Sequence, residues 1–309
     1  MRALIVTNMY PSPARPALGS FVADQVQALR RTGEAEVEVF AFHPGGAGAY
    51  ARAARRLRVH CRQRPRYEIV HAHFGLTCWP ALAASARARL VTLHGTDLVH
   101  PRSRAITLAG LRVNDLVATV SEPLAATVPR WAARGRPAVL PCGVDLRRFG
   151  PIDRREARRR LGLDPAGPYL LFPSDPARAE KRFDRARAIA GDVRLLTLGA
   201  VAPEDVPLHV NAANAVLVPS DREGFGLAVL EALACDVPVL ATPVGVHPEA
   251  LGGIPGTLSA LYDPAVWQAA LAPHLASSDP RVEGRARAER YSTDAMAERV
   301  MAAWRGLLQ

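Results

Sequence analysis

Three glutamates and three glycines lie in the stretch PSDREGFGLAVLEALACDVPVLATPVGVHPEA, residues 219–250. Glu223, Gly224 and Gly226 fall in a loop after an apolar run, and a helix is predicted from about 226 to 235. Glycines let the backbone approach a ligand closely, and the amides at a helix N-terminus favour phosphate or hydroxyl groups. We therefore expect this loop and helix start to cradle an anionic or polyol ligand.

The two carboxylates suggest which ligand this is. Glu231 lies about five residues into the predicted helix, roughly 7.5 Å along its axis. A carboxylate there can accept hydrogen bonds from both hydroxyls of a ribose, while Glu223 can accept from a second polyol. Phosphate-binding amides between two such carboxylates suit a nucleotide-sugar. The alternative is structural: Glu223 as a carboxylate favoured by the helix dipole, and Glu231 as a solvated surface residue.

The same stretch resembles the signature of glycosyltransferase family 4. That family has two glutamates separated by seven residues, followed by E-A-x-A-x-x-x-P-V and a later G-x-x-x-E. The matching residues are Glu223, Glu231, Ala232, Ala234, Pro238, Val239, Gly245 and Glu249. Segments that follow in the family's order are 7–29, 71–75, 91–98, 119–122 and 142–149. The resemblance therefore covers nearly the whole chain; the departures are Cys142, Asp236 and a length shorter than most relatives.

The resemblance implies a fold and an activity. The fold is α/β of the GT-B type: two facing Rossmann-like doubly wound parallel-sheet domains. The activity is that of a retaining hexosyltransferase, which moves a sugar from a nucleotide diphosphate-sugar, a UDP- or GDP-sugar, to a hydroxyl of a glycan, lipid-linked or small-molecule acceptor. No metal or other cofactor is expected, and the sequence contains no Asp-x-Asp pair to hold a metal on the diphosphate. The alternative is a nucleotide-sugar epimerase or phosphorylase on the same fold.

Residue roles carried over from the resemblance start with Lys181, the only lysine among 39 Lys and Arg residues. It matches the family's diphosphate-binding lysine, and we expect Lys181, Glu223 and His94 to be catalytic. His94 matches the family's histidine near the donor sugar; otherwise it is an ordinary loop histidine. The residues expected to bind the donor are Gly19, Arg178, Gly224, Phe225, Gly226, Leu227 and Glu231. The loops 8–19 and 199–208 are expected to border the acceptor and the nucleotide.

His71 and His73 are two residues apart on a predicted strand, so their side chains point the same way. A zinc pair is possible in this geometry, but no third ligand is evident. We favour a role in lining the cleft or in hydrogen bonding to a neighbouring loop, with no metal site.

Short apolar runs alternate with longer segments of helical periodicity along the chain. The runs predicted as strands are 3–7, 37–42, 68–73, 89–93, 115–120, 138–141, 169–173, 193–199, 215–220 and 237–242. Such alternation predicts parallel sheets covered by helices on both faces. Ligands of these sheets bind at the carboxyl ends of the strands, so the function should lie in the loops that follow them.

The alternation breaks between about 143 and 167, a polar segment with one short arginine-rich helix. We take it as the connection between two domains. The predicted domains are an N-terminal acceptor-side domain, 1–150, and a C-terminal donor domain, 151–291. A final amphipathic helix, 292–309, is predicted to pack back on the N-terminal domain.

The composition indicates which classes of partner the protein can bind. A formal net charge of +10 favours anionic partners such as nucleotide phosphates. Aromatic residues make up only 6% and do not interleave with the arginine runs, which argues against nucleic-acid binding. The segment 51–66 holds seven arginines and is either a contact for anionic membrane or a solvated helix. Dispersed cysteines and an N-terminus unlike a signal peptide predict a cytoplasmic protein, with possible association at the cytoplasmic membrane face.

Overall fold

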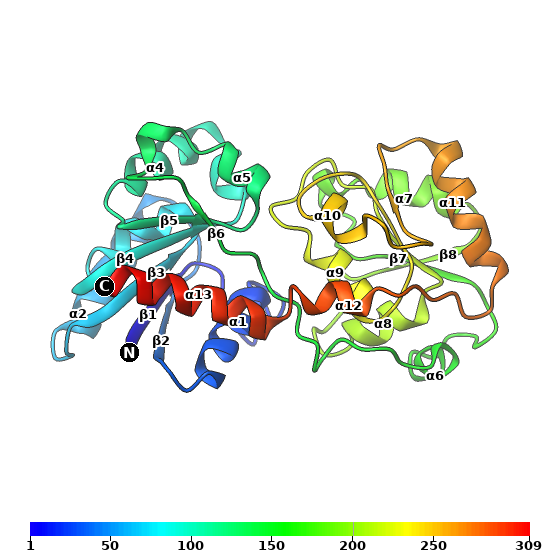
Figure 1. Ribbon diagram of the computed structural model, residues 1–309, viewed down its shortest axis with the longest axis horizontal. Coiled ribbons are helices and arrows are strands. Elements are labelled where there is room, and N and C mark those ends of the chain that lie inside the picture. Colours follow the sequence, from blue (N-terminus) through cyan, green and yellow to red (C-terminus); the bar gives the residue numbers. More distant parts are fainter. Residues whose placement is uncertain (200) are drawn as a thin grey trace. The chain divides into compact units, whose positions relative to one another are not determined.

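The computed structural model describes residues 1–199 and 201–309, and it divides them into two compact units (Figure 1). Unit 1 comprises Met1–Gly143 and Thr293–Gln309, and unit 2 comprises Val144–Ser292. The division falls at Gly143 instead of residue 150 because Val144 pairs with Ser292 in a parallel bridge, and its amide donates to the Tyr291 carbonyl at 2.8 Å.

Unit 1 contains a six-stranded parallel sheet in its described residues, in the order β2-β1-β3-β4-β5-β6. The strands are β1 Arg2–Thr7, β2 Glu36–Ala41, β3 Tyr67–His73, β4 Ala86–Leu93, β5 Leu116–Thr119 and β6 Ala138–Val139. Neighbouring residues along β1 pack on opposite faces: Ile5 joins one apolar core and Leu4 the other. This is the two-sided burial that continuous apolar runs predict.

The helices of unit 1 cover both faces of that sheet. They are α1 Ser20–Arg31, α2 Ala47–Cys61, α3 Cys78–Ala81, α4 Pro101–Leu111, α5 Glu122–Ala126 and α13 Thr293–Leu308. One core holds α1 and α13, and the other holds α2, α3 and α4. The carboxyl ends of the strands are thereby left to the loops.

The last helix, α13, lies alongside α1 although the two are far apart in sequence (Figure 1). Met296, Val300 and Trp304 recur every four residues, so they share one face of the helix. That face is buried against Val22 and Val26 of α1, and the Trp304 side chain is fully buried. The C-terminal residues therefore complete the core of unit 1.

Unit 2 contains a five-stranded parallel sheet in its described residues, in the order β11-β10-β9-β7-β8. The strands are β7 Tyr169–Phe172, β8 Arg194–Thr197, β9 Ala215–Val218, β10 Val239–Ala241 and β11 Leu258–Ser259. The helices are α6 Arg154–Arg160, α7 Phe183–Ala190, α8 Val206–Ala212, α9 Leu227–Ala234, α10 His247–Leu251, α11 Pro264–Ala276 and α12 Arg285–Glu289. A one-turn 3₁₀ helix, η4 Ala179–Lys181, follows β7.

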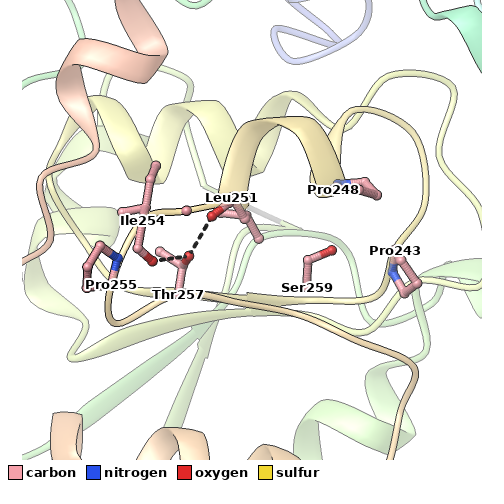
Figure 2. Close-up of a pocket in the computed structure, with 9 residues that line it drawn as sticks. Pro243, Pro248, Leu251, Ile254, Pro255, Thr257 and Ser259 are labelled. Atoms are coloured by element: carbon pink, nitrogen blue, oxygen red, sulfur yellow. Dashed lines mark hydrogen bonds between the residues drawn. The ribbon is translucent and has the colours of Figure 1, made fainter.

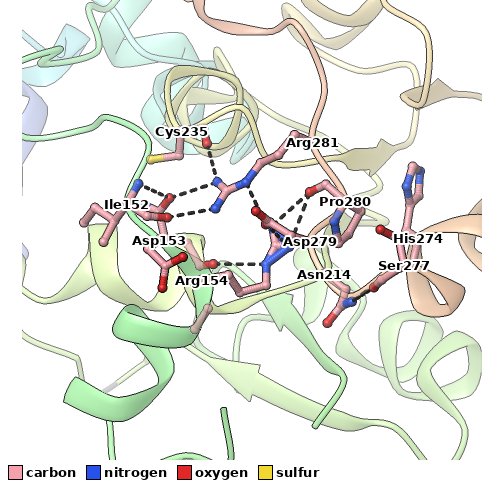
Figure 3. Close-up of polar contacts among 12 residues, drawn as sticks. Ile152, Asp153, Arg154, Asn214, Cys235, His274, Ser277, Asp279, Pro280 and Arg281 are labelled. Atoms are coloured by element: carbon pink, nitrogen blue, oxygen red, sulfur yellow. Dashed lines mark hydrogen bonds and ion pairs between the residues drawn. The ribbon is translucent and has the colours of Figure 1, made fainter. Parts of the chain in front are cut away.

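The expected connecting segment is packed into unit 2 by its own arginines. Arg154 is 1% exposed, and its guanidinium donates to the Pro280 carbonyl at 2.9 Å (Figure 3). Arg158 donates to the Ala212 carbonyl at 2.9 Å and to Asn214 Oδ1 at 2.8 Å. Burial lowers the pKa of Arg154 to about 9. These arginines therefore fasten α6 to the unit and are not part of a solvated linker.

Within the described residues, no helix is long and apolar enough to cross a membrane.

Candidate active site

Lys181 and Glu223 meet at the carboxyl ends of the strands in unit 2. Lys181 ends η4, after β7, and Glu223 lies in the loop between β9 and α9. The Lys181 ammonium lies 2.7 Å from Glu223 Oε1 and 2.6 Å from Oε2, and the Ser220 hydroxyl donates to Oε1 at 2.8 Å. The side chains are only 15% and 10% exposed. The result is a partly desolvated ion pair at the edge where the fold binds ligands.

Two further contacts hold this loop in place. The amide of Asp221 donates to the Glu180 carbonyl at 2.9 Å, which ties the loop after β9 to η4. The Asp221 carboxylate pairs with Arg185 at 2.8 Å and Arg182 at 3.3 Å. Neither arginine could be predicted from the sequence, because nothing near them in the chain pointed to Asp221.

Gly226, at the start of α9, allows the chain to pack closely against a neighbouring side chain. Gly226 has φ of 103°, and a Cβ on it would lie 2.4 Å from His247 Nε2. The His247 ring is buried, and its Nδ1 lies 2.8 Å from the Thr242 carbonyl. Burial lowers the pKa of His247, so the ring is neutral near pH 7. Glycine is therefore required at 226 by a buried imidazole, a reason the sequence alone does not show.

The other predicted donor residues of this stretch lie around the same helix start. Phe225 is 6% exposed and its ring packs 6.0 Å from that of Tyr291, so the side chain belongs to the core. Gly224 precedes it in the loop, Leu227 is the first residue of α9, and Glu231 is half-buried one turn further along. In the described residues no side chain caps the N-terminus of α9, so its amides are directed out of the helix.

A second group of polar side chains lies at the carboxyl ends of β3 and β4 in unit 1. His73 Nδ1 lies 3.0 Å from His94 Nε2, and Gln25 Nε2 lies 3.4 Å from His73 Nε2. His71 Nε2 lies 2.7 Å from the Thr92 hydroxyl. The three imidazoles are stacked in sequence, with centroids 4.4 Å and 5.3 Å apart. This confirms neither a ligand role nor a metal role, but it shows that a hydrogen bond links His73 to His94, whereas His71 stacks on His73 and bonds to Thr92.

Burial keeps this group neutral. His71 and His73 are fully buried, and His94 is partly exposed. Desolvation lowers the pKa of all three, that of His73 to about 3. In the part of the chain described, no set of three or more His, Cys, Asp or Glu side chains could hold a metal ion.

Asp97 fixes the two loops that carry these histidines. Its carboxylate accepts from the Gly75 amide and from the His94 amide, both at 2.6 Å. Burial raises its pKa, while the amide hydrogen bonds oppose that shift. The segment 91–98 was selected for His94. Asp97 was missed because an Asp after Gly-Thr is typical of an ordinary turn.

Two protein-family models match the chain. The model described as Glycosyltransferase Family 4 matches residues 5–148, and the one described as Glycosyl transferases group 1 matches 170–277. The curated D-inositol 3-phosphate glycosyltransferase of Actinosynnema mirum is 30% identical over 80% of this chain and 75% of its own length. The chain belongs to glycosyltransferase family 4. A second relative with the same printed name, from Mycolicibacterium gilvum, is 30% identical over 76% of this chain, which spans 64% of that relative's length.

Solved structures give the fold of this family 4 chain. Sucrose-phosphate synthase from Thermosynechococcus elongatus matches with a TM-score of 0.75 at 20% identity, over 99% of both chains. HepE from Anabaena, in complex with UDP and glucose, matches with a TM-score of 0.72 at 16% identity, over 98% of this chain and 99% of that one. Together with the two parallel sheets, these neighbours confirm the GT-B fold.

Arg178 of this family 4 chain does not share the Lys181 pair. Its guanidinium donates twice to Glu180 Oε1, at 3.1 and 2.8 Å, and its side chain is 51% exposed. Its role toward the donor stays a prediction. The loop 199–208, expected to border the nucleotide, includes Ala200, which lies outside the described residues.

Gly19 shapes the first loop of unit 1. It has φ of 69°, and a Cβ on it would lie 2.3 Å from the Met9 carbonyl oxygen, so only glycine lets α1 begin this close to the preceding loop. Beside that loop lies a cavity of about 200 Å³. Its polar lining comes from Asn8, Ser12 and Arg56, among others, and none of the described residues that line it is a carboxylate.

A cavity of about 510 Å³ lies beside α10 and β11 (Figure 2). Its polar side chains are Thr257, whose hydroxyl donates to the Leu251 and Ile254 carbonyls, and Ser259. Among the described residues that line it, none carries a charge or a group that titrates near neutral pH. This cavity therefore offers little to a reaction that builds negative charge.

Proposed function

We propose that the chain is a retaining glycosyltransferase that moves a sugar from a UDP- or GDP-sugar to an acceptor hydroxyl without a metal ion. The observation that carries the proposal is the Lys181–Glu223 pair beside the uncapped start of α9. It joins one cation, one carboxylate and a set of helix amides, the groups that a sugar diphosphate requires. Family membership and the UDP in the HepE complexes support it.

In this proposal unit 2 binds the donor. Lys181 exchanges part of its contact with Glu223 for the diphosphate, and the α9 amides contact the same anion. The released Glu223 carboxylate accepts from hydroxyls of the donor sugar, and Glu231 accepts from the ribose. Each charge-assisted hydrogen bond to the leaving group would contribute about 1.5–3 kcal/mol. Such preorganised donors are usually the main source of rate enhancement.

The reaction balances without any further reagent. The bond between the anomeric carbon and the diphosphate oxygen breaks, and a bond from that carbon to the acceptor oxygen forms on the same face. The departing phosphate oxygen takes the acceptor proton. Because that oxygen takes the proton, no side-chain base is needed. His94 contributes by hydrogen bonding to sugar hydroxyls.

Unit 1 is proposed to bind the acceptor in the 200 Å³ cavity beside the first loop. Arg56 brings a positive charge, and Asn8, Tyr10, Ser12 and His43 bring hydrogen-bonding groups. This lining suits a small polyol that can carry a negative charge. The matched relatives named for D-inositol 3-phosphate fit that class.

The basic helix α2 is proposed as a contact for anionic membrane at the cytoplasmic face. Arg52, Arg55 and Arg56 line a groove of about 590 Å³ that also includes Val59. The Val59 side chain is 63% exposed, so α2 presents an apolar group among cations. Co-sedimentation with vesicles containing anionic lipid should exceed that with neutral vesicles, and equal binding would remove this contact from the proposal.

The activity is tested by incubating the full chain with UDP-, GDP- and ADP-sugars, with and without polyol acceptors. Chromatography measures nucleoside diphosphate release, and proton NMR gives the anomeric configuration of the product. Acceptor-dependent release with retained configuration supports the proposal. Conversion of the donor in the absence of acceptor would instead indicate an epimerase, and phosphate-dependent cleavage would indicate a phosphorylase.

A further inference from the structure

Three side chains from three separate elements form a hydrogen-bonded row in unit 1. Gln25 comes from α1, His73 from the end of β3, and His94 from the loop after β4. The amide nitrogen of Gln25 lies 3.4 Å from His73 Nε2, and His73 Nδ1 lies 3.0 Å from His94 Nε2. Gln25 is 8% exposed and His73 is fully buried, so the bond between them is shielded from water.

With the Gln25 amide nitrogen facing His73, only one placement of the ring protons satisfies both hydrogen bonds. The Gln25 amide nitrogen can only donate, so His73 Nε2 must be the lone-pair nitrogen. A neutral His73 then carries its proton on Nδ1 and donates it to His94 Nε2. The remaining proton of a neutral His94 must sit on Nδ1.

From this geometry we propose that Gln25 and His73 are positioning residues that hold His94 in its Nδ1–H tautomer, so that it presents a hydrogen-bond donor to a substrate hydroxyl. The inference rests on the proposed function, because it assigns the form in which His94 meets the sugar. In the part of the chain described, no hydrogen bond is made by Nδ1 of His94, and the residue is partly exposed. That nitrogen is therefore the one left for a ligand.

The residues around His94 restrict rotation of its ring. Its ring packs against Phe21, with centroids 4.9 Å apart, and against Phe74, with centroids 4.6 Å apart. The Asp97 carboxylate accepts from the His94 amide at 2.6 Å and fixes the backbone. These contacts, together with the hydrogen bond to His73, oppose an exchange of the two ring nitrogens, so the tautomer decides whether Nδ1 donates or accepts.

Neutral rings are needed for this order, since a protonated His73 would donate from both nitrogens. Burial supports neutrality, because it lowers the pKa of His73 to about 3. His71 lies next to His73, but its Nε2 bonds to Thr92 and it takes no part in the row. Asp97, the carboxylate at this end of the sheet, has both oxygens occupied by amides.

Nitrogen-15 NMR of the free, histidine-labelled protein tests the proposal without any enzymatic activity. Long-range proton–nitrogen spectra distinguish a protonated imidazole nitrogen from a lone-pair nitrogen. We expect His94 to be protonated on Nδ1 and His73 on Nδ1. A proton on Nε2 of His94 would overturn the proposal, whether or not the protein proves to be a glycosyltransferase.

A matched pair of variants on α1 adds a functional readout. Gln25→Met keeps the length of the side chain and removes the donor, whereas Gln27→Met makes the same change at an exposed position of the helix. We expect Gln25→Met to give His94 a mixture of tautomers and a several-fold lower kcat, with Gln27→Met unchanged in both. If His94 keeps one tautomer in Gln25→Met, Gln25 does not position it.

Discussion

Lys181, the single lysine of the chain, lies with its ammonium 2.6 and 2.7 Å from the two carboxylate oxygens of Glu223. Both residues were predicted to act on the donor, and in the structure they bind each other. A diphosphate that approaches Lys181 must therefore compete with Glu223, and the negative charge of Glu223 opposes its approach.

Replacing Glu223 by Gln should separate diphosphate binding from sugar binding. Without the competing carboxylate, UDP or GDP should bind about tenfold more tightly, a change of ~1.4 kcal/mol. Transfer from the complete nucleotide-sugar should fall, because an amide is a poorer acceptor for sugar hydroxyls. Titration calorimetry measures the first effect and a transfer assay the second. Weaker binding of the free diphosphate would mean that Glu223 does not compete for Lys181.

The start of α9 should not tolerate a side chain at position 226. Gly226→Ala places a Cβ 2.4 Å from His247 Nε2 in a backbone with φ of 103°. We expect a loss of about 2–4 kcal/mol in the free energy of unfolding from strain and displacement of the buried ring. Urea denaturation measures it. The double variant Gly226→Ala/His247→Ala should lose less free energy of unfolding than the sum of the two single losses, because the clash is gone. Strict additivity would show that the ring and the glycine are not coupled.

Acid should destabilise unit 1 through its buried histidines. The folded-state pKa of His73 is lowered to about 3 from 6.5, so the unfolded chain takes up the proton first as the pH falls. The contribution of a buried neutral histidine to the free energy of unfolding is therefore full above about pH 6.5. It declines toward pH 3, by up to ~1.4 kcal/mol per pH unit for each such histidine. Urea unfolding at pH 7.5, 6.5 and 5.5 should show this slope, and His73→Gln should reduce it. A variant with the full slope would assign the acid sensitivity elsewhere.

Asp97 should be needed for the loops that hold His94. Asp97→Ala removes the acceptor of two amides, those of Gly75 and His94, at a cost of about 1–3 kcal/mol for each amide left unpaired. Asp97→Asn keeps one carbonyl oxygen and should lose roughly half as much. Denaturation curves of the two variants rank them, and equal stability of wild type and Asp97→Ala would contradict this role.

Much of the fold could be predicted from the chain because parallel strands buried on both faces leave continuous apolar runs. All ten predicted runs overlap strands of the two sheets. The edge strand β11, Leu258–Ser259, was missed because two residues carry no periodicity. The buried Arg154 and Arg158 were missed because arginine in a polar segment predicts a solvated face, and only the fold supplies the carbonyls that they bind.

The candidate site was predictable in its residue types and less so in its contacts. The spacing of Glu223 and Gly226, together with the resemblance to glycosyltransferase family 4, pointed to the loop after β9. The pairing of Glu223 with Lys181, 42 residues apart, depends on the neighbouring positions of β7 and β9 in the sheet. The same holds for the row from Gln25 to His94, which joins three elements that no local pattern connects.

The most direct test of the account compares Glu223→Gln with the double variant Lys181→Ala/Glu223→Gln. Neither protein contains a buried carboxylate without a cation, so the comparison isolates the Lys181 ammonium. We predict that the double variant melts at the same temperature but binds UDP and GDP at least about tenfold more weakly, a loss of ~1.4 kcal/mol or more. Equal affinity of the two variants for both nucleotides would contradict the claim that Lys181 holds the donor diphosphate.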